Sequence, residues 1–358
     1  MIDKFDYKSV TTTMNKSADR TSRLSPRPRI LVTNQLHPSV LERLHADFEV
    51  LMNETPEPWD ADTLRAKLEE HQPEGLIAFM SDHINTEILQ ASRQLKIVAA
   101  ALKGTNNIDV ESATALGICV TYVPGLLTEP TAELTLALML MQARQLPQAT
   151  QFVQSGRFKG WEPRFYAKTL FDAEVGLLGF GAIGQKLTQL LAPFRARVKC
   201  HDPALTGPSA ESAMGAVVCD FDEVVQTTDY LVLALPYTPA THHLVNKKLL
   251  KQMRQGAVLV NTARGSIVNE YAVADALQVN HLSGYVADVF EMEDWAIAAR
   301  PKVIDPRLLS DSRVVMSPHI GSAIQAVREQ IEKEAAESIV DFYANKPLPT
   351  CLNPQIRN

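Results

Sequence analysis

One segment near the middle of the chain, Gly179-Phe-Gly-Ala-Ile-Gly184, constrains the fold more than any other. An apolar run over residues 175–178 leads directly into these glycines, and an amphipathic stretch over residues 182–191 follows them. A strand, a glycine-rich turn and a helix in this order begin a dinucleotide-binding βαβ unit. The sequence therefore predicts an α/β fold with a doubly wound parallel sheet.

The glycines and the start of the helix predict the contacts of a bound dinucleotide. Gly179 permits the tight turn, Gly181 lets the backbone approach a pyrophosphate, and Gly184 allows the helix to pack closely on the sheet. The backbone N–H groups near Ala182 and Ile183 then face the phosphates at the positive end of the helix dipole.

Asp202 predicts which dinucleotide is bound. It ends the next expected strand, 18 residues after Gly184. A carboxylate at this place accepts hydrogen bonds from ribose hydroxyls and repels a 2′-phosphate. Because no Lys or Arg follows Asp202 in His-Asp-Pro-Ala, NAD is expected rather than NADP. The alternative, that Asp202 only caps the turn after it, stays open.

Strand-like and helical stretches alternate along two parts of the chain, which predicts two α/β units with parallel sheets. A long apolar helix separates the two series, and an amphipathic helix at the end is expected to return to the first unit. The predicted strands cover residues 29–33, 48–52, 75–80 and 95–101, then 174–179, 198–201, 230–235, 257–261, 284–289 and 314–316; the predicted helices cover residues 38–45, 61–71, 129–144, 182–191 and 323–343.

Composition excludes several other classes of protein. The net charge of −6 argues against nucleic acid or an anionic membrane as the main partner. The longest apolar stretch, residues 134–141, is far shorter than the ~20 residues that span a bilayer. Four scattered cysteines predict neither a disulfide framework nor a metal site, and they favour a reducing, cytoplasmic location. Residues 1–28 lack the apolar segment of a secretory signal and are expected to form a mobile polar extension.

Three further motifs stand at the carboxyl ends of expected strands, where an open α/β sheet forms its cleft. They contain Arg264 in Asn-Thr-Ala-Arg-Gly-Ser, Glu291 in Ala-Asp-Val-Phe-Glu and His319 in Ser-Pro-His-Ile-Gly. The Arg264 guanidinium offers planar donors to an anion. His319 can exchange a proton near neutral pH, and Glu291 can orient the imidazole ring.

Together these motifs resemble the D-isomer-specific 2-hydroxyacid dehydrogenase family, and the resemblance covers residues 29 to about 348. It implies a Rossmann NAD-binding domain, residues 128–321, inserted into a smaller flavodoxin-like catalytic domain, residues 29–127 and 322–350. It also implies a homodimer built by elements of the NAD-binding domain. Further cofactor contacts implied by the resemblance are Thr131, Leu235, Pro236, Thr262, Ala263 and Asp288.

A closer resemblance, to the phosphite (phosphonate) dehydrogenases of that family, narrows the expected substrate. It rests on segments such as Val-Phe-Glu-Met-Glu-Asp-Trp at 289–295 and Gly-Trp-Glu-Pro-Arg-Phe-Tyr at 160–166. It implies NAD-dependent oxidation of phosphite to phosphate, with Arg264, Glu291 and His319 as catalytic residues. The substrate contacts that it implies are Lys103, Gly104, Met80, Trp161, Tyr166, Ser322 and Arg328.

Lys103 supports this substrate on electrostatic grounds. Phosphite is a dianion, and a second cation beside Arg264 suits it better than a carboxylate. The alternative for Lys103 is an ordinary solvated lysine on a loop. Two other functions also stay open: a dehydrogenase of glyoxylate, hydroxypyruvate or D-lactate, and an NAD-sensing corepressor. The intact set of Arg, Glu and His weighs against the corepressor.

Overall fold

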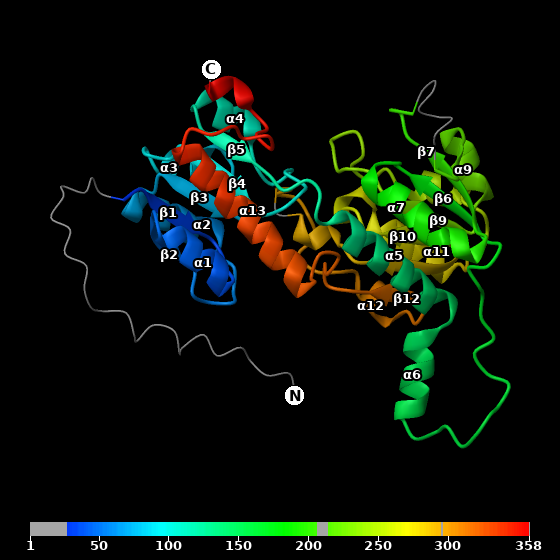
Figure 1. Ribbon diagram of the computed structural model, residues 1–358. Helices are drawn as coiled ribbons and strands as arrows, with labels where there is room; N and C mark the ends of the chain where they lie inside the picture. Colours follow the sequence, from blue (N-terminus) through cyan, green and yellow to red (C-terminus); the bar gives the residue numbers. More distant parts are fainter. Residues whose placement is uncertain (1–26, 206–213, 295, 358) are drawn as a thin grey trace.

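A computed structural model describes residues 27–205, 214–294 and 296–357, and it contains two parallel sheets (Figure 1). The first has five strands in the order β2-β1-β3-β4-β5, and the second has seven in the order β12-β11-β10-β9-β6-β7-β8. The predicted α/β fold with two parallel-sheet domains is therefore confirmed. The strands are β1 (Arg29–Val32), β2 (Glu49–Met52), β3 (Gly75–Ala78), β4 (Ile97–Ala100), β5 (Cys119–Thr121), β6 (Glu174–Leu178), β7 (Arg197–His201), β8 (Val217–Val218), β9 (Tyr230–Leu233), β10 (Ala257–Asn261), β11 (Leu282–Ala287) and β12 (Val314–Met316).

The first sheet has the strand order of flavodoxin-like folds. Its central strands β3 and β4 are buried along their whole length, as expected for parallel strands covered on both faces. Separate apolar clusters fill the two sides of the sheet. The helices of this part are α1 (Pro38–His45), α2 (Ala61–His71), α3 (Thr86–Ala91) and α4 (Val110–Ala115).

The last long helix, α13 (Gln325–Tyr343), packs on the first sheet although it follows the second in the sequence (Figure 1). Ile331, Ala335 and Ile339 recur on one side of the helix and are fully buried in the core with β1, β3 and β4. The chain therefore leaves the first sheet, builds the second and returns. The exact domain bounds remain a prediction, and most of the predicted extension 1–28 lies outside the described residues.

The second sheet has the Rossmann order, because β6, β7 and β8 run outward on one side and β9 to β12 on the other. The order reverses between β6 and β9, so the carboxyl ends of these strands flank the crevice of the sheet. All ten predicted strands are present, whereas the short strands β5 and β8 were not predicted. The helices here are α5 (Thr128–Ala143), α7 (Ala182–Leu191), α9 (Phe221–Thr227), α10 (Lys247–Gln252), α11 (Glu270–Gln278) and α12 (Pro306–Ser310).

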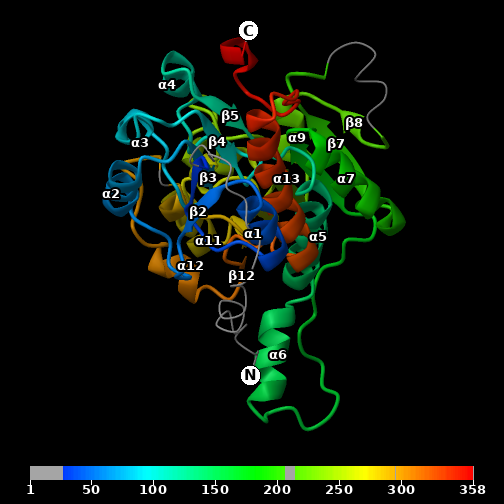
Figure 2. The ribbon, with the colours of Figure 1, turned by 60° about the vertical axis from the view of Figure 1, so that its left-hand side comes forward.

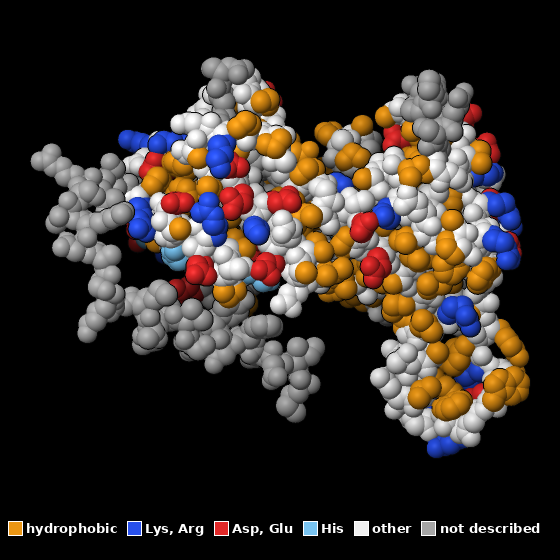
Figure 3. Space-filling view, viewed as in Figure 1, with side chains coloured by type: hydrophobic (Ala, Val, Ile, Leu, Met, Phe, Trp, Pro, Cys, Tyr) orange, Lys and Arg blue, Asp and Glu red, His pale blue; other side chains and the backbone are white. Residues whose placement is uncertain are grey.

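An arm formed by α6 (Leu146–Gln154) and residues 155–172 projects from the second domain (Figures 1 and 2). Its apolar side chains face outward: Trp161 is 87% exposed and Tyr166 is 79% exposed. Figure 3 shows apolar side chains gathered on this arm, below the main body.

Two features are absent from the part of the chain that the structure describes. No helix there is long and apolar enough to cross a membrane. Within the same residues, no group of three or more His, Cys, Asp or Glu side chains could hold a metal ion.

Candidate active site

The glycine turn between β6 and α7 forms an open cradle at the start of the helix. Gly179 has a φ of 90°, and a Cβ atom at this position would overlap the backbone of Ala234 after β9. A Cβ atom on Gly181 would meet no atom within 4 Å, and no side chain caps the start of α7 at this residue. Backbone N–H groups and the helix dipole therefore face free space, which fits the pyrophosphate of a dinucleotide.

Asp202 lies against this cradle and also caps the turn that follows it. Its Oδ2 accepts a hydrogen bond from the backbone N–H of Phe180 at 2.8 Å, and Oδ1 accepts one from Ala204 at 2.9 Å. Asp202 therefore does cap the turn that follows it, as the alternative interpretation expects, but this contact does not occupy every lone pair of the carboxylate. Each carboxylate oxygen keeps a further lone pair, so Asp202 can still accept from ribose hydroxyls beside the glycine turn.

Other predicted cofactor residues surround the same edge of the sheet. Leu235 and Pro236 follow β9, where the backbone approaches Gly179 most closely. The Thr262 hydroxyl after β10 contacts that of Thr135 on α5 at 2.8 Å. Thr131, one turn earlier on α5, donates to the carbonyl of Gly321 at 3.4 Å. The ends of β6, β9 and β10 and the start of α5 thus converge.

Asp288, at the end of β11, anchors the loop that carries His319. Its Oδ1 accepts hydrogen bonds from the Ser317 hydroxyl at 2.5 Å and from the Ile320 N–H at 2.9 Å. Its Oδ2 accepts one from the Gly321 N–H at 2.9 Å. Burial raises the pKa of Asp288, although these hydrogen bonds favour the ionised form. They hold His319 in a left-handed conformation with φ of 55°. A direct contact of Asp288 with the cofactor stays a prediction.

A cavity of about 420 Å³ lies between the two sheets, bordered by both domains. Five predicted site residues line it: Met80, Arg264, His319, Ser322 and Arg328. The remaining lining comes from Asn34, Pro58, Phe79, Ser81, Asn106, Asn107, Glu293, Asp294, Ala296 and Ala323.

Arg264 connects the two domains across this cavity. Its Nε donates to Asn106 Oδ1 at 3.2 Å, and its Nη1 donates to the carbonyl of Ala263 at 2.8 Å. A Cβ atom at Gly104 would overlap the end of the Arg264 guanidinium, so a larger residue there would force this side chain to shift. Burial lowers the pKa of Arg264, while nearby acids favour its charged form.

His319 is paired with Glu293, and the prediction that Glu291 orients its ring is wrong. The His319 Nδ1 lies 3.0 Å from Glu293 Oε2. Glu291 is buried, and its Oε1 lies 2.5 Å from the Nε2 of His243 instead. Both acids belong to the short 3₁₀ turn η4 (Glu291–Glu293), and its winding directs the side chain of residue 293 toward His319. The Nε2 of His319 is left for a ligand in the cavity.

Lys103 and Arg328 add positive charge near Arg264. Lys103 is half-buried at the end of β4, in the loop whose Asn106 lines the cavity, and burial lowers the pKa of its ammonium. Burial also lowers the pKa of Arg328, which lies over the ring of Phe79 at 5.9 Å. Among the described residues, no carboxylate forms an ion pair with any of the three cations.

Four predicted substrate residues are not among those that line the cavity: Lys103 and Gly104, which precede Asn106 in its loop, and Trp161 and Tyr166. Trp161 and Tyr166 lie on the projecting arm with most of their surface exposed, and neither lines the cavity. The prediction that they border the pocket within one chain is therefore wrong. The reason is the arm itself, which follows α6 away from the second sheet.

Three further residues that line the cavity were not predicted from the sequence: Asn106, Glu293 and Asp294. Two acids stand two residues apart in Glu291-Met-Glu293, so the sequence offered the signal for Glu293 without deciding between them. Asn106 follows the expected β4 strand in the same loop as Lys103. No sequence pattern around Asn106 predicts the contact of its amide with Arg264, which follows 158 positions later.

Comparison with known proteins gives consistent similarities. The family model for the NAD-binding domain of D-isomer specific 2-hydroxyacid dehydrogenases matches residues 136–321. A glyoxylate reductase of Thermococcus onnurineus is 32% identical over 337 residues, which cover 93% of this chain and 98% of that protein. A glyoxylate reductase of Aeropyrum pernix is 34% identical over 335 residues, which cover 92% of this chain and 97% of that protein.

Two solved structures are similar over the same range. The TT0316 protein of Thermus thermophilus has a TM-score of 0.80 at 32% identity, covering 90% of this chain and 99% of that one. An NADPH-dependent glyoxylate/hydroxypyruvate reductase of Sinorhizobium meliloti, solved with NADP and malonate, has a TM-score of 0.78 at 30% identity. It covers 91% of this chain and 97% of that one.

Replacing Asp202 tests the preference for NAD. Asp202→Ala removes the repulsion of a 2′-phosphate and the acceptors for the ribose, so the ratio of kcat/KM for NAD to that for NADP should fall. A charged hydrogen-bonding contact is worth ~1.5–3 kcal/mol, which corresponds to roughly one to two decades in this ratio. Steady-state kinetics with both nucleotides measure it. An unchanged ratio means that Asp202 serves only the turn.

Proposed function

We propose that this chain, which belongs to the D-isomer specific 2-hydroxyacid dehydrogenase family, oxidises phosphite to phosphate with NAD. The observation that carries the substrate proposal is the positive charge at the cavity, where Arg264 and Arg328 line the wall, and beside it, where Lys103 lies in the loop of Asn106. Lys103, Arg264 and Arg328 are all partly desolvated, and the described residues supply none of them with an ion pair. Such a set matches a small dianion better than a monocarboxylate.

The proposed reaction balances as phosphite, water and oxidised NAD giving phosphate, reduced NAD and a proton. When bound, the cofactor accepts the hydride that leaves phosphorus. Arg264 and Lys103 bind the phosphite oxygens and stabilise the charge that develops on them. The neutral imidazole of His319 accepts a proton from the attacking water at Nε2, because Nδ1 is held by Glu293. Glu293 then stabilises the imidazolium.

A second candidate is the reduction of glyoxylate or a related 2-oxo acid. The names of the similar proteins support it, since several of them are glyoxylate reductases. In this reaction Arg264 would bind the carboxylate of the acid. His319 would donate a proton to the carbonyl oxygen, so the same residues serve in the opposite direction. Lys103 would then have no anion that requires it.

Lys103 separates the two candidates. Lys103→Met keeps most of the apolar stem and removes the ammonium, which we expect to donate charge-assisted hydrogen bonds worth ~1.5–3 kcal/mol each. The KM for phosphite should therefore rise at least about tenfold, while the affinity for NAD and the melting temperature change little. The assay follows NADH absorbance with phosphite and with a panel of 2-hydroxy and 2-oxo acids.

The wild type and the variant together decide the substrate. A wild-type enzyme that ignores phosphite and reduces glyoxylate would establish the second candidate. Phosphite kinetics that stay intact in Lys103→Met would make the residue a solvated loop lysine. Thr105→Ser, a mild change in the same loop, serves as the matched control and should leave phosphite kinetics unchanged.

His319 and its partner carry the acid–base chemistry. His319→Ala should lower kcat by ~10²–10⁴-fold, the range for loss of a general base, and leave NAD binding nearly intact. Glu293→Gln keeps the size of the side chain but removes its charge, so kcat should fall by a smaller factor, about tenfold or more. A loss below tenfold in His319→Ala, with the fold retained, would contradict the assignment of the base.

We further propose a homodimer that contacts through the arm. Residues 146–171 expose six large apolar side chains, which a second copy would cover. Those side chains are Leu146, Val153, Phe158, Trp161, Tyr166 and Phe171. Sedimentation equilibrium should give twice the mass of the chain, and Trp161→Glu combined with Phe158→Glu should shift it toward the monomer. A wild-type chain that sediments as a monomer would reject the proposal. A cytoplasmic location stays a prediction.

A further inference from the structure

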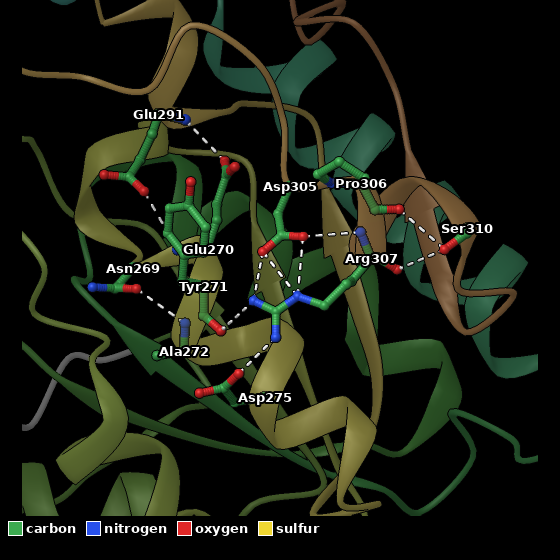
Figure 4. A network of polar contacts seen from close by, with 10 residues as sticks. All are labelled: Asn269, Glu270, Tyr271, Ala272, Asp275, Glu291, Asp305, Pro306, Arg307 and Ser310. Carbon is green, nitrogen blue, oxygen red and sulfur yellow. Dashed lines mark hydrogen bonds and ion pairs between the residues drawn. The ribbon is translucent and has the colours of Figure 1, made fainter.

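The turn η4 is held in place by a buried acid that no part of the proposed chemistry uses. This acid is Glu270, the first residue of α11. Its Oε1 accepts a hydrogen bond from the backbone N–H of Glu291 at 2.9 Å, and Glu291 Oε2 accepts one from the backbone N–H of Glu270 at 3.4 Å. Figure 4 shows the two side chains reaching past each other, each to the backbone of the other. Only 2% of Glu270 and 4% of Glu291 are exposed.

The same turn presents Glu293 to His319. One carboxylate oxygen of Glu293 accepts from the backbone N–H of Phe290 at 2.8 Å, and the other lies 3.0 Å from His319 Nδ1. The backbone N–H groups of Phe290 and Glu291 are therefore both held by carboxylates, one from the turn itself and one from α11. The orientation of Glu293 depends on the position of this backbone, because its side chain is tied to Phe290.

A second contact leaves the turn little room to move. A Cβ atom at Gly265 would overlap the carbonyl group of Phe290 and the N–H of Glu291, so two backbone segments touch here. On the same side, Asp294 Oδ2 accepts from the N–H of Ser266 at 2.7 Å. The turn thus lies between α11 and the segment that follows Arg264, and Glu270 supports it from the side of α11.

We propose that Glu270 is a positioning residue: its carboxylate holds the backbone of η4 so that Glu293 meets His319 in the cavity. The proposal rests on the proposed roles of His319 and Glu293, but it is independent of which substrate the enzyme uses. Displacing a catalytic group by about 1 Å can cost ~10²-fold in rate, so support of this kind matters for turnover.

Several titratable groups face Glu270 from the elements packed around it. They are Glu291 and Glu293 on η4, Asp305 before α12 and Tyr285 on β11, and the outer oxygen of Glu291 is paired with His243. Burial, together with the charges of these acids, raises the pKa of Glu270 to about 7. Because the folded pKa lies above the usual value, ionisation of Glu270 destabilises the fold as pH rises from about 4.5 through 7.

The experiment compares Glu270→Ala, Glu270→Gln and a matched control, Asp305→Ala. The Gln side chain can still accept from the Glu291 N–H, whereas Ala cannot. Asp305 is another buried acid of the same region, but Figure 4 shows it bound to Arg307, where its Oδ2 lies 2.6 Å from Nη2, and not to η4. Steady-state kinetics, melting temperature at pH 5 and pH 8, and ¹⁵N NMR of the His319 ring, assigned with His319→Ala, are measured on the full chain.

We expect kcat to fall about tenfold to a hundredfold in Glu270→Ala, with unchanged NAD affinity and a shifted His319 Nδ1 resonance. Glu270→Gln should keep kcat within about threefold and should weaken the loss of melting temperature from pH 5 to pH 8. Asp305→Ala should lower the melting temperature without moving the His319 signal.

Two outcomes would overturn the proposal: a His319 resonance in Glu270→Ala identical to the wild type, or equal effects of Glu270→Ala and Asp305→Ala on kcat. If His319→Ala itself keeps its activity, the proposed function fails instead, and the resonance still reports whether Glu270 positions Glu293.

Discussion

The rest of the site depends on the Arg264 guanidinium, which lies between two domains and is partly desolvated there. A desolvated cation is costly unless it is paired or binds an anion. Within the described residues the guanidinium of Arg264 donates only to neutral oxygens, those of Asn106 and Ala263. Its remaining donors face a cavity that both sheets border. Two glycines make this arrangement sterically allowed: Gly104 gives room to the guanidinium, and Gly265 lets the following backbone pack against η4.

Acids form a second layer behind the cations and adjust the site without neutralising it. Glu293 contacts His319 from η4, and Asp294 binds the backbone after Arg264. Glu270 lies deeper and holds the backbone of that turn, and the Glu291 side chain accepts in return from the backbone of α11. The cavity therefore keeps its positive charge for an anion, while the negative charges orient the groups that move protons.

Much of the fold followed from local patterns, because parallel strands buried on both faces read as short apolar runs and because a glycine turn requires a special backbone conformation. Asp202, Arg264 and His319 could be placed near strand ends for the same reason. The sequence could not show whether Glu291 or Glu293 contacts His319. The two acids lie two residues apart, and the 3₁₀ turn decides which side chain points toward the histidine. The prediction for Trp161 and Tyr166 failed because a resemblance in sequence does not show in which direction an arm projects from its domain.

The sequence by itself determined the doubly wound architecture, the dinucleotide cradle and the residue types of the site, since each depends on spacing along a few consecutive residues. Only the tertiary structure decided which acid meets His319 and that Asn106 binds a guanidinium 158 residues away. These features arise where separate elements meet. Side-chain direction and backbone packing at such junctions depend on the whole fold, and no local pattern encodes them.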